Sequence, residues 1–105
     1  MSCRVAVSAQ AQEDLRRLHK FLLERELNRD GGDLDYPDVA VNAIESAFGV
    51  LQRHPYTCRK TDNNPFWRDL VISFGRTGYV ALFEIASDDL IIVTAIRHQR
   101  DDDYH

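Results

Sequence analysis

The first half of the chain contains two segments whose apolar residues repeat with the period of a helix. Within residues 9–29 the apolar positions recur at spacings of four, three and four, and they are Ala11, Leu15, Leu18 and Leu22. This spacing places them on one face of an amphipathic helix. Ser8 stands before that helix as a suitable N-cap, and the "DGGD" of residues 30–33 is expected to end it.

The second helical pattern begins near Pro37, a residue that suits the first turn of a helix because no N–H is needed there. Its apolar stripe consists of Ala40, Ile44, Ala47, Phe48 and Leu51. Pro55 is expected to stop it. Because only a short polar link separates the two segments, we expect an antiparallel helical hairpin.

The remaining patterns are those of strands. Residues 3–8 alternate polar and apolar, and "WRDLVISF" (67–74), "YVALFEI" (79–85) and "LIIVTAI" (90–96) predict three more strands around the turns "GRTG" and "ASDD". The last strand is apolar on both faces, which is typical of a strand inside a sheet. The order β-α-α-β-β-β predicts a single α+β domain over residues 1–105, with the helical hairpin packed on one face of a small, mostly antiparallel sheet.

Residues 56–66, "YTCRKTDNNPF", show no periodicity and predict a loop. We expect Phe66 and Trp67 to pack this loop onto the core. We expect Arg68 and Arg76 to be exposed and available to a partner. Arg59 and Lys60 belong to a basic stretch without acids, which is a candidate contact surface or a solvated loop.

Composition narrows the class of protein. A formal net charge of −4 argues against a domain that is held on nucleic acid by bulk electrostatics. Cys3 and Cys58 lie in no metal-ligand spacing, so we expect free thiols. His98 and the terminal aspartates lack a second ligand group of fixed geometry, so we expect no metal there. We also expect no cofactor and no small-molecule substrate. Since no apolar run reaches about eighteen residues and the N-terminus lacks an apolar signal region, we expect a cytoplasmic protein with no membrane contact.

The densest group of ionisable side chains closes the chain. It consists of Arg97, His98, Arg100, three aspartates (101–103), Tyr104 and His105. These residue types are consistent with a nuclease site, with a contact surface for a partner, or with a solvated terminus. His98 has a reference pKa near neutral, so it could act as a general base or as a structural hydrogen-bonding group.

In this order, the segments resemble the RelE/ParE superfamily of bacterial type II toxins over nearly the whole chain. "VSAQAQEDLRRLHKFL" (7–22) is similar to the family's opening strand and its S-x-x-A-x-x-D-L helix, and "AFGVLQRHP" (47–55) to the end of its second helix. "LVISFGRTGYVALFEI" and "LIIVTAIRHQRDDDY" are similar to its closing hairpin and last strand. The resemblance implies a toxin whose partner is a cognate antitoxin.

Two branches of this superfamily differ in their target. The mRNA-cutting branch, which is similar to RelE, keeps a basic residue directly after the "GY" of the middle strand. Cations are needed there because RNA cleavage builds negative charge on the phosphate. In this chain the position is Val80. The ParE branch, whose members inhibit DNA gyrase, commonly has an apolar residue there and ends its last strand in an H-x-R sequence.

We therefore predict a ParE-like toxin that inhibits DNA gyrase, is not an enzyme, and is neutralised by a cognate antitoxin. The predicted partner-binding residues are Arg97, His98, Arg100, Arg59 and Lys60. The alternative is a RelE-like, ribosome-dependent mRNA endonuclease with His98, Arg100 and Tyr104 as catalytic residues. A third possibility is an inactive family member that only binds its antitoxin.

Overall fold

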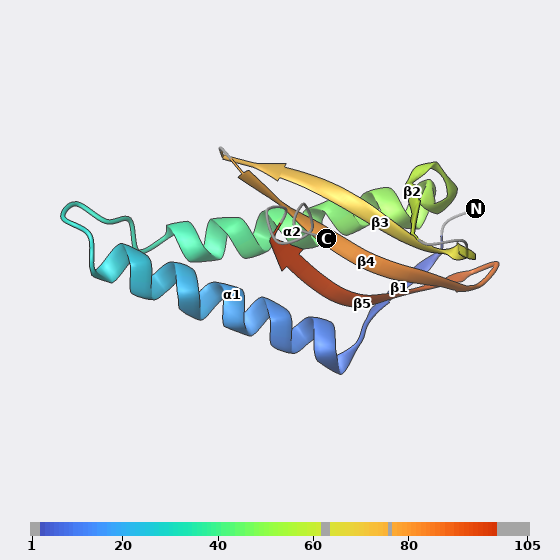
Figure 1. The fold of residues 1–105 in the computed structure, drawn as a ribbon, viewed down its shortest axis with the longest axis horizontal. Coiled ribbons are helices and arrows are strands. Elements are labelled where there is room, and N and C mark those ends of the chain that lie inside the picture. Colours follow the sequence, from blue (N-terminus) through green and yellow to red (C-terminus); the bar gives the residue numbers. More distant parts are fainter. Residues whose placement is uncertain (1–2, 62–63, 76, 99–105) are drawn as a thin grey trace.

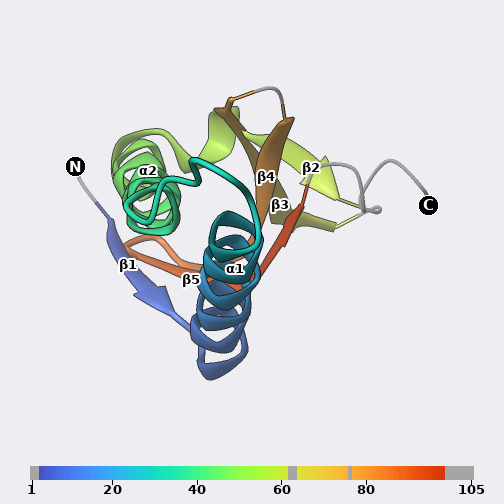
Figure 2. The same ribbon diagram turned by 90° about the vertical axis from the view of Figure 1, so that its left-hand side faces the viewer.

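The computed structural model describes residues 3–61, 64–75 and 77–98. Its elements in chain order are β1 (Arg4–Val7), α1 (Ala9–Leu27), α2 (Tyr36–Arg53), the 3-10 helix η1 (Pro55–Thr57), β2 (Arg59–Thr61), β3 (Asn64–Phe74), β4 (Thr77–Ser87) and β5 (Leu90–His98). The two helices lie side by side on one face of the sheet, which curves around them (Figure 1 and Figure 2). The predicted α+β fold is confirmed, with the short strand β2 added.

The five strands are ordered β1-β5-β4-β3-β2. β1 runs parallel to β5, and every other neighbouring pair is antiparallel. β5 therefore lies inside the sheet, as its apolar sequence predicts. β1 pairs with β5 only from Leu90 to Val93, so among the described residues the second half of β5 has no strand on that side.

Local signals set the bounds of the helices. Ser8 caps α1, because its Oγ accepts the Ala11 N–H at 3.1 Å. α1 ends at Leu27, earlier than the "DGGD" that was expected to end it. The link folds back on the helix, since the buried carboxylate of Glu26 accepts the Asp33 N–H at 3.1 Å. Pro37 lies in the first turn of α2, as predicted.

Alternate residues of the strands face the helices, and the others point to the opposite side, which we call the open face. Phe83, Ile91 and Val93 are buried under the helices together with Ile44 and Leu51. Burying each of these side chains stabilises the fold by about 1.5–3 kcal/mol. Cys3 and Cys58 are free thiols. No helix in the described part of the chain is long and apolar enough to cross a membrane.

The prediction of a loop over residues 56–66 is wrong. η1, β2 and the first residues of β3 occupy this segment. β2 is only three residues long and pairs Arg59 with Asp69 and Lys60 with Arg68. Such a strand exists because β3 offers it a hydrogen-bonding edge, and a segment this short has no period of its own to detect.

Arg68 is the residue that fixes this corner of the molecule, and the expectation that it is exposed is wrong. It is 7% exposed. Its guanidinium donates hydrogen bonds of between 2.8 and 2.9 Å to three backbone carbonyls, those of Tyr56, Cys58 and Pro65. The expectation that Phe66 and Trp67 pack onto the core is also wrong, because they are 52% and 45% exposed. Arg76 lies outside the described residues.

Candidate functional site

The end of β5 carries the described part of the terminal ionisable cluster. Arg97 lies opposite Val80 of β4, and His98 lies opposite Tyr79. Successive residues of a strand point to opposite faces of the sheet. Because Tyr79 belongs to the core beneath the helices, His98 lies on the helix side and Arg97 on the open face. The strand therefore separates two neighbouring candidate residues.

His98 packs against a series of aromatic rings. Its ring centroid lies 5.6 Å from that of Tyr79, and the two planes meet at 88°. Phe74 and Tyr36 continue the series, with centroid separations of 6.3 and 5.5 Å, and the Arg25 guanidinium lies over Tyr36. Burial raises the pKa of the Tyr79 hydroxyl. The series connects the end of β5 to the start of α2 and the end of α1.

Asp14 of α1 holds β5 in place where β1 has ended. One carboxylate oxygen of Asp14 accepts the Ile96 N–H at 3.0 Å. Ser8 makes a similar connection, because its N–H donates to the Val93 carbonyl at 2.9 Å and its hydroxyl to the Thr94 carbonyl at 3.2 Å. The beginning of α1 thus replaces β1 as the neighbour of β5. This gives a physical role to the serine and the aspartate of the S-x-x-A-x-x-D-L motif.

We expect Asp14→Ala to destabilise the fold by about 2 kcal/mol, because the partly buried Ile96 N–H loses its acceptor. Amide hydrogen exchange at residues 96–98 should become faster than in the wild type. Asp14→Asn is the matched control, since its side-chain oxygen can still accept this hydrogen bond. Equal exchange rates in all three proteins would show that the contact does not hold the end of β5.

Val80 lies on the open face between Val71 of β3 and Arg97 of β5. Its side chain is completely buried, at 0% exposure. Val80 occupies the position at which the mRNA-cutting, RelE-like branch keeps a basic residue near the RNA phosphate. This position is therefore apolar and closed to solvent, and an arginine there would require neighbouring side chains to move.

The two basic candidates from β2 point to opposite sides. Arg59 donates to both carboxylate oxygens of the buried Asp69, at 2.8 and 2.9 Å. This pair lies on the open face, three strands from Arg97, which corresponds to about 14 Å across the sheet. Lys60 is exposed and lies opposite Arg68, on the helix side. Arg100 and Tyr104 lie outside the described residues.

The four described candidates are therefore divided between the two faces of the sheet. Arg59 and Arg97 lie on the open face, and Lys60 and His98 lie on the helix side. Sequence reasoning did not single out Tyr79, which packs against His98, Asp14, which accepts the Ile96 N–H, or Asp69, which pairs with Arg59. The position of Asp14 in the family motif was a usable signal. For Asp69 there was none, because its partner Arg59 belongs to a strand that was not predicted.

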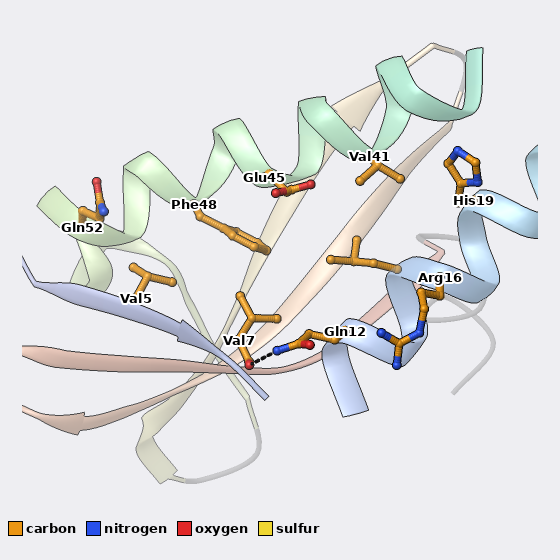
Figure 3. A pocket seen from close by; sticks show the side chains of 10 residues that line it. Val5, Val7, Gln12, Arg16, His19, Val41, Glu45, Phe48 and Gln52 are labelled. Atoms are coloured by element: carbon orange, nitrogen blue, oxygen red, sulfur yellow. Dashed lines mark hydrogen bonds between the residues drawn. The ribbon is translucent and has the colours of Figure 1, made fainter. Parts of the chain in front are cut away.

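A groove of about 650 Å³ lies between α1, α2 and β1 (Figure 3). Its apolar residues are Val5, Val7, Leu15, Val41 and Phe48, and its polar residues are Gln12, Arg16, His19, Glu45 and Gln52. His19 Nε2 lies 2.8 Å from Asp38 Oδ1 and links the two helices. The Gln12 amide donates to the Val7 carbonyl at 3.0 Å. An apolar floor with a rim of mixed charge suits a peptide segment with apolar anchors.

A helical hairpin on a sheet of this order, with a basic end to its last strand, is the arrangement that the resemblance to small RelE/ParE-type toxins led us to expect. The chain matches the model of the family described as the ParE toxin of the type II toxin-antitoxin system parDE over residues 5–103. The chain belongs to this family. Membership implies a cognate antitoxin as its partner.

Two known proteins illustrate the similarity. Toxin RelE3 of Caulobacter vibrioides is 30% identical over 94 residues, which cover 90% of this chain and 91% of the relative. A solved chain of the chromosomal ParDE toxin-antitoxin system from P. aeruginosa superposes with a TM-score of 0.68 at 15% identity. That match covers 92% of this chain and 96% of the solved chain and identifies the fold.

Proposed function

We propose that this toxin inhibits DNA gyrase and that its cognate antitoxin neutralises it. In this proposal Arg97, His98 and Arg100 contact the gyrase, and no residue of the chain acts as a catalyst. The family match over residues 5–103 supports the proposal. So does the resemblance to the ParE branch near the start of the middle strand and at the end of the last strand.

The observation that carries the proposal is the burial of Val80. An RNA-cleaving site needs cations around the phosphate, and the position that supplies one in the mRNA-cutting branch holds a valine with 0% exposure. Of the two described basic candidates at the end of the last strand, Arg97 lies beside Val80 on the open face, whereas His98 packs against Tyr79 on the helix side. The candidate cation and the candidate general base therefore do not converge on one substrate position.

The open face is the gyrase-binding surface in this proposal. Arg97 shares that face with the exposed residues Trp67, Val71 and Arg59. Trp and Arg are enriched among the residues that dominate the binding energy of protein interfaces. Arg59 is held in place by Asp69, so less side-chain entropy is lost when a partner binds it.

The groove between α1, α2 and β1 is the antitoxin-binding site in this proposal (Figure 3). A disordered segment that folds on binding could place apolar side chains over Val7, Leu15 and Phe48 and pair its charges with Arg16 and Glu45. The groove lies on the helix side of the molecule. An antitoxin that blocks Arg97 directly must therefore also extend around the end of β5.

The test is a gyrase supercoiling assay with purified toxin that has been freed of antitoxin. We expect wild-type toxin to abolish supercoiling of relaxed plasmid in the presence of ATP and to cause cleaved DNA to accumulate. Arg97→Ala should raise the half-inhibitory concentration at least about tenfold, the effect of losing roughly 1.4 kcal/mol of binding. Arg16→Ala is the matched control, because Arg16 is an exposed arginine in the groove and should leave inhibition unchanged.

Unchanged supercoiling at a large excess of wild-type toxin would contradict the proposal. Equal loss of inhibition in Arg97→Ala and Arg16→Ala would leave gyrase as the target but contradict the open face as the contact surface. A titration of both variants with the antitoxin in the same assay distinguishes the two surfaces, since only Arg16→Ala should weaken neutralisation.

The second candidate function is ribosome-dependent mRNA cleavage. The observation that favours it is the relative of 30% identity, which carries the name Toxin RelE3. Its test is to add the toxin to translating ribosomes and to map the ends of the mRNA. Cleavage that is lost in His98→Ala, with gyrase unaffected, would establish this alternative in place of the first.

A further inference from the structure

The outer edge of β3 has a segment without a strand partner. β3 has 11 residues and β2 has three, and β2 pairs with β3 no further along than Asp69. In the part of the chain that the structure describes, no strand residue is paired with the outer side of Leu70–Phe74. We call this side of residues 70–74 the β3 edge.

The sequence of the β3 edge, "LVISF", contains none of the features that protect exposed edges. It has no charge, no proline and no glycine, and Val71 is 41% exposed. An unprotected edge of this kind is a template for pairing with another strand. The opposite edge of the sheet is different, because β1 has four residues, begins with the exposed Arg4, and has its Val7 carbonyl occupied by Gln12.

A stripe of apolar residues on α2 adjoins the β3 edge. Tyr36 marks this side of the helix, because its ring packs against Phe74 at 5.5 Å. Val39, Ala43 and Val50 follow Tyr36 at successive intervals of three, four and seven residues, so they share its side of the helix. Val39 and Val50 are 52% and 38% exposed. Strand edge and helix stripe together form one uncovered apolar surface, opposite the groove of Figure 3.

We propose that this surface binds a second copy of the chain, through antiparallel pairing of the two β3 edges about a two-fold axis at Ile72. This pairing sets residue 70 opposite 74 and residue 71 opposite 73. It therefore keeps Leu70, Ile72 and Phe74 of both chains on the helix side, as antiparallel register requires. Residues 70–74 carry no charge, so the pairing of two such edges brings no like charges together. The edge is thus complementary to itself, which is the condition for an isologous dimer.

The geometry of β2 and of the β3–β4 turn limits the assembly. β3 leaves the sheet edge at Gly75, whose φ is +60°. In this register Gly75 of the first chain falls opposite the partner's Asp69, which the partner's own Arg59 already pairs, so the pairing between the two chains ends at Phe74. Because the β1 edge is protected, assembly stops at two chains. Five residues of strand and one helix stripe bury less than the roughly 1,600 Å² of a standard interface, so the dimer is weak and reversible.

Sedimentation equilibrium of the purified, antitoxin-free chain over a range from micromolar to millimolar tests this proposal. We expect the average mass to rise from that of a monomer toward twice that value. Hydrogen exchange at residues 70–74 should slow over the same range. A wild-type protein that stays monomeric at millimolar concentration would overturn the proposal.

Charge variants test the register. The double variant Val71→Lys/Ser73→Lys and the double variant Val71→Glu/Ser73→Glu should each remain monomeric, because like charges would face each other across the axis. Mixed in equal amounts, they should associate at least about tenfold more tightly than either alone. Both positions are exposed, and a thermal melt of each variant verifies that it folds.

The matched control is Ala6→Lys/Ala86→Lys, which adds the same charge as the double lysine variant at two exposed sheet positions away from the β3 edge. It should dimerise like the wild type. The proposal fails if the charged β3 variants dimerise as the wild type does, or if mixing the two oppositely charged variants restores no association.

Discussion

Gly32→Ala will destabilise the toxin by about 3 kcal/mol, because the new methyl group has no room. A Cβ at Gly32 would lie 1.9 Å from the backbone carbonyl oxygen of Glu26 and 2.8 Å from its carbonyl carbon. Both atoms belong to the last turn of α1, so they cannot rotate away as a flexible side chain would. The link between α1 and α2 must open to admit the methyl group, and the Asp33 N–H then loses the Glu26 carboxylate.

Gly31→Ala is the matched control in the same turn. Gly31 has a φ of +71°, and a Cβ there would meet nothing within 4 Å. Its substitution costs only the backbone strain of a left-handed alanine, about 1 kcal/mol. Urea unfolding of both variants measures the difference. A smaller loss for Gly32→Ala than for Gly31→Ala would contradict the close approach of the link to α1.

The second large effect is expected for Arg68→Met, which should destabilise the fold by about 3 kcal/mol. The substitution removes a guanidinium that bonds the carbonyls of Tyr56, Cys58 and Pro65, and it leaves these acceptors partly buried. It also removes the contact of the guanidinium with the Tyr56 ring, whose centroid is 5.2 Å away. The melting temperature should fall by roughly 15 °C for a domain of this size.

Arg97→Met makes the same chemical change at an exposed position of the same sheet, so it is the control for Arg68→Met. We expect its stability to stay within about 0.5 kcal/mol of the wild type. Hydrogen exchange provides a local readout, since only Arg68→Met should release the amides of β2. Equal stabilities of the two variants would mean that the three carbonyls are satisfied by water when Arg68 is absent.

The helical hairpin and the three long strands were predictable because each is marked in its own sequence, by a helical or alternating repeat or, for β5, by a continuous apolar run. Ala11 and Leu22 of α1, and Ile44 and Leu51 of α2, are buried as their spacing predicts. Ser8 and Pro37 act at the helix starts as their chemistry suggests. Failures occurred in residues 56–68, where structure depends on partners distant in sequence. Arg68, for example, is buried where its guanidinium bonds the backbone carbonyls of Tyr56 and Cys58.

The candidate site shows the same limit at the scale of single residues. Arg97 and His98 are adjacent in sequence, but the alternation of β5 places them on opposite faces of the sheet. Arg59 and Lys60 are separated in the same way on β2. A count of basic residues near the end of a strand cannot distinguish a converging site from a divided one. The period of two along each strand, combined with the pairing register, makes that distinction.

By itself the sequence determined the two α-helices, the four longer strands, their order and the family, because these follow from local periodicity, from caps and from motifs carried by neighbouring residues. Tertiary structure alone decided what surrounds each functional candidate. Val80 became a closed position, Asp14 became the neighbour of β5, and the β3 edge was left open where β2 ends. These outcomes depend on which distant segments pair and pack. That choice is made by the free energy of the whole fold rather than by any short stretch of chain.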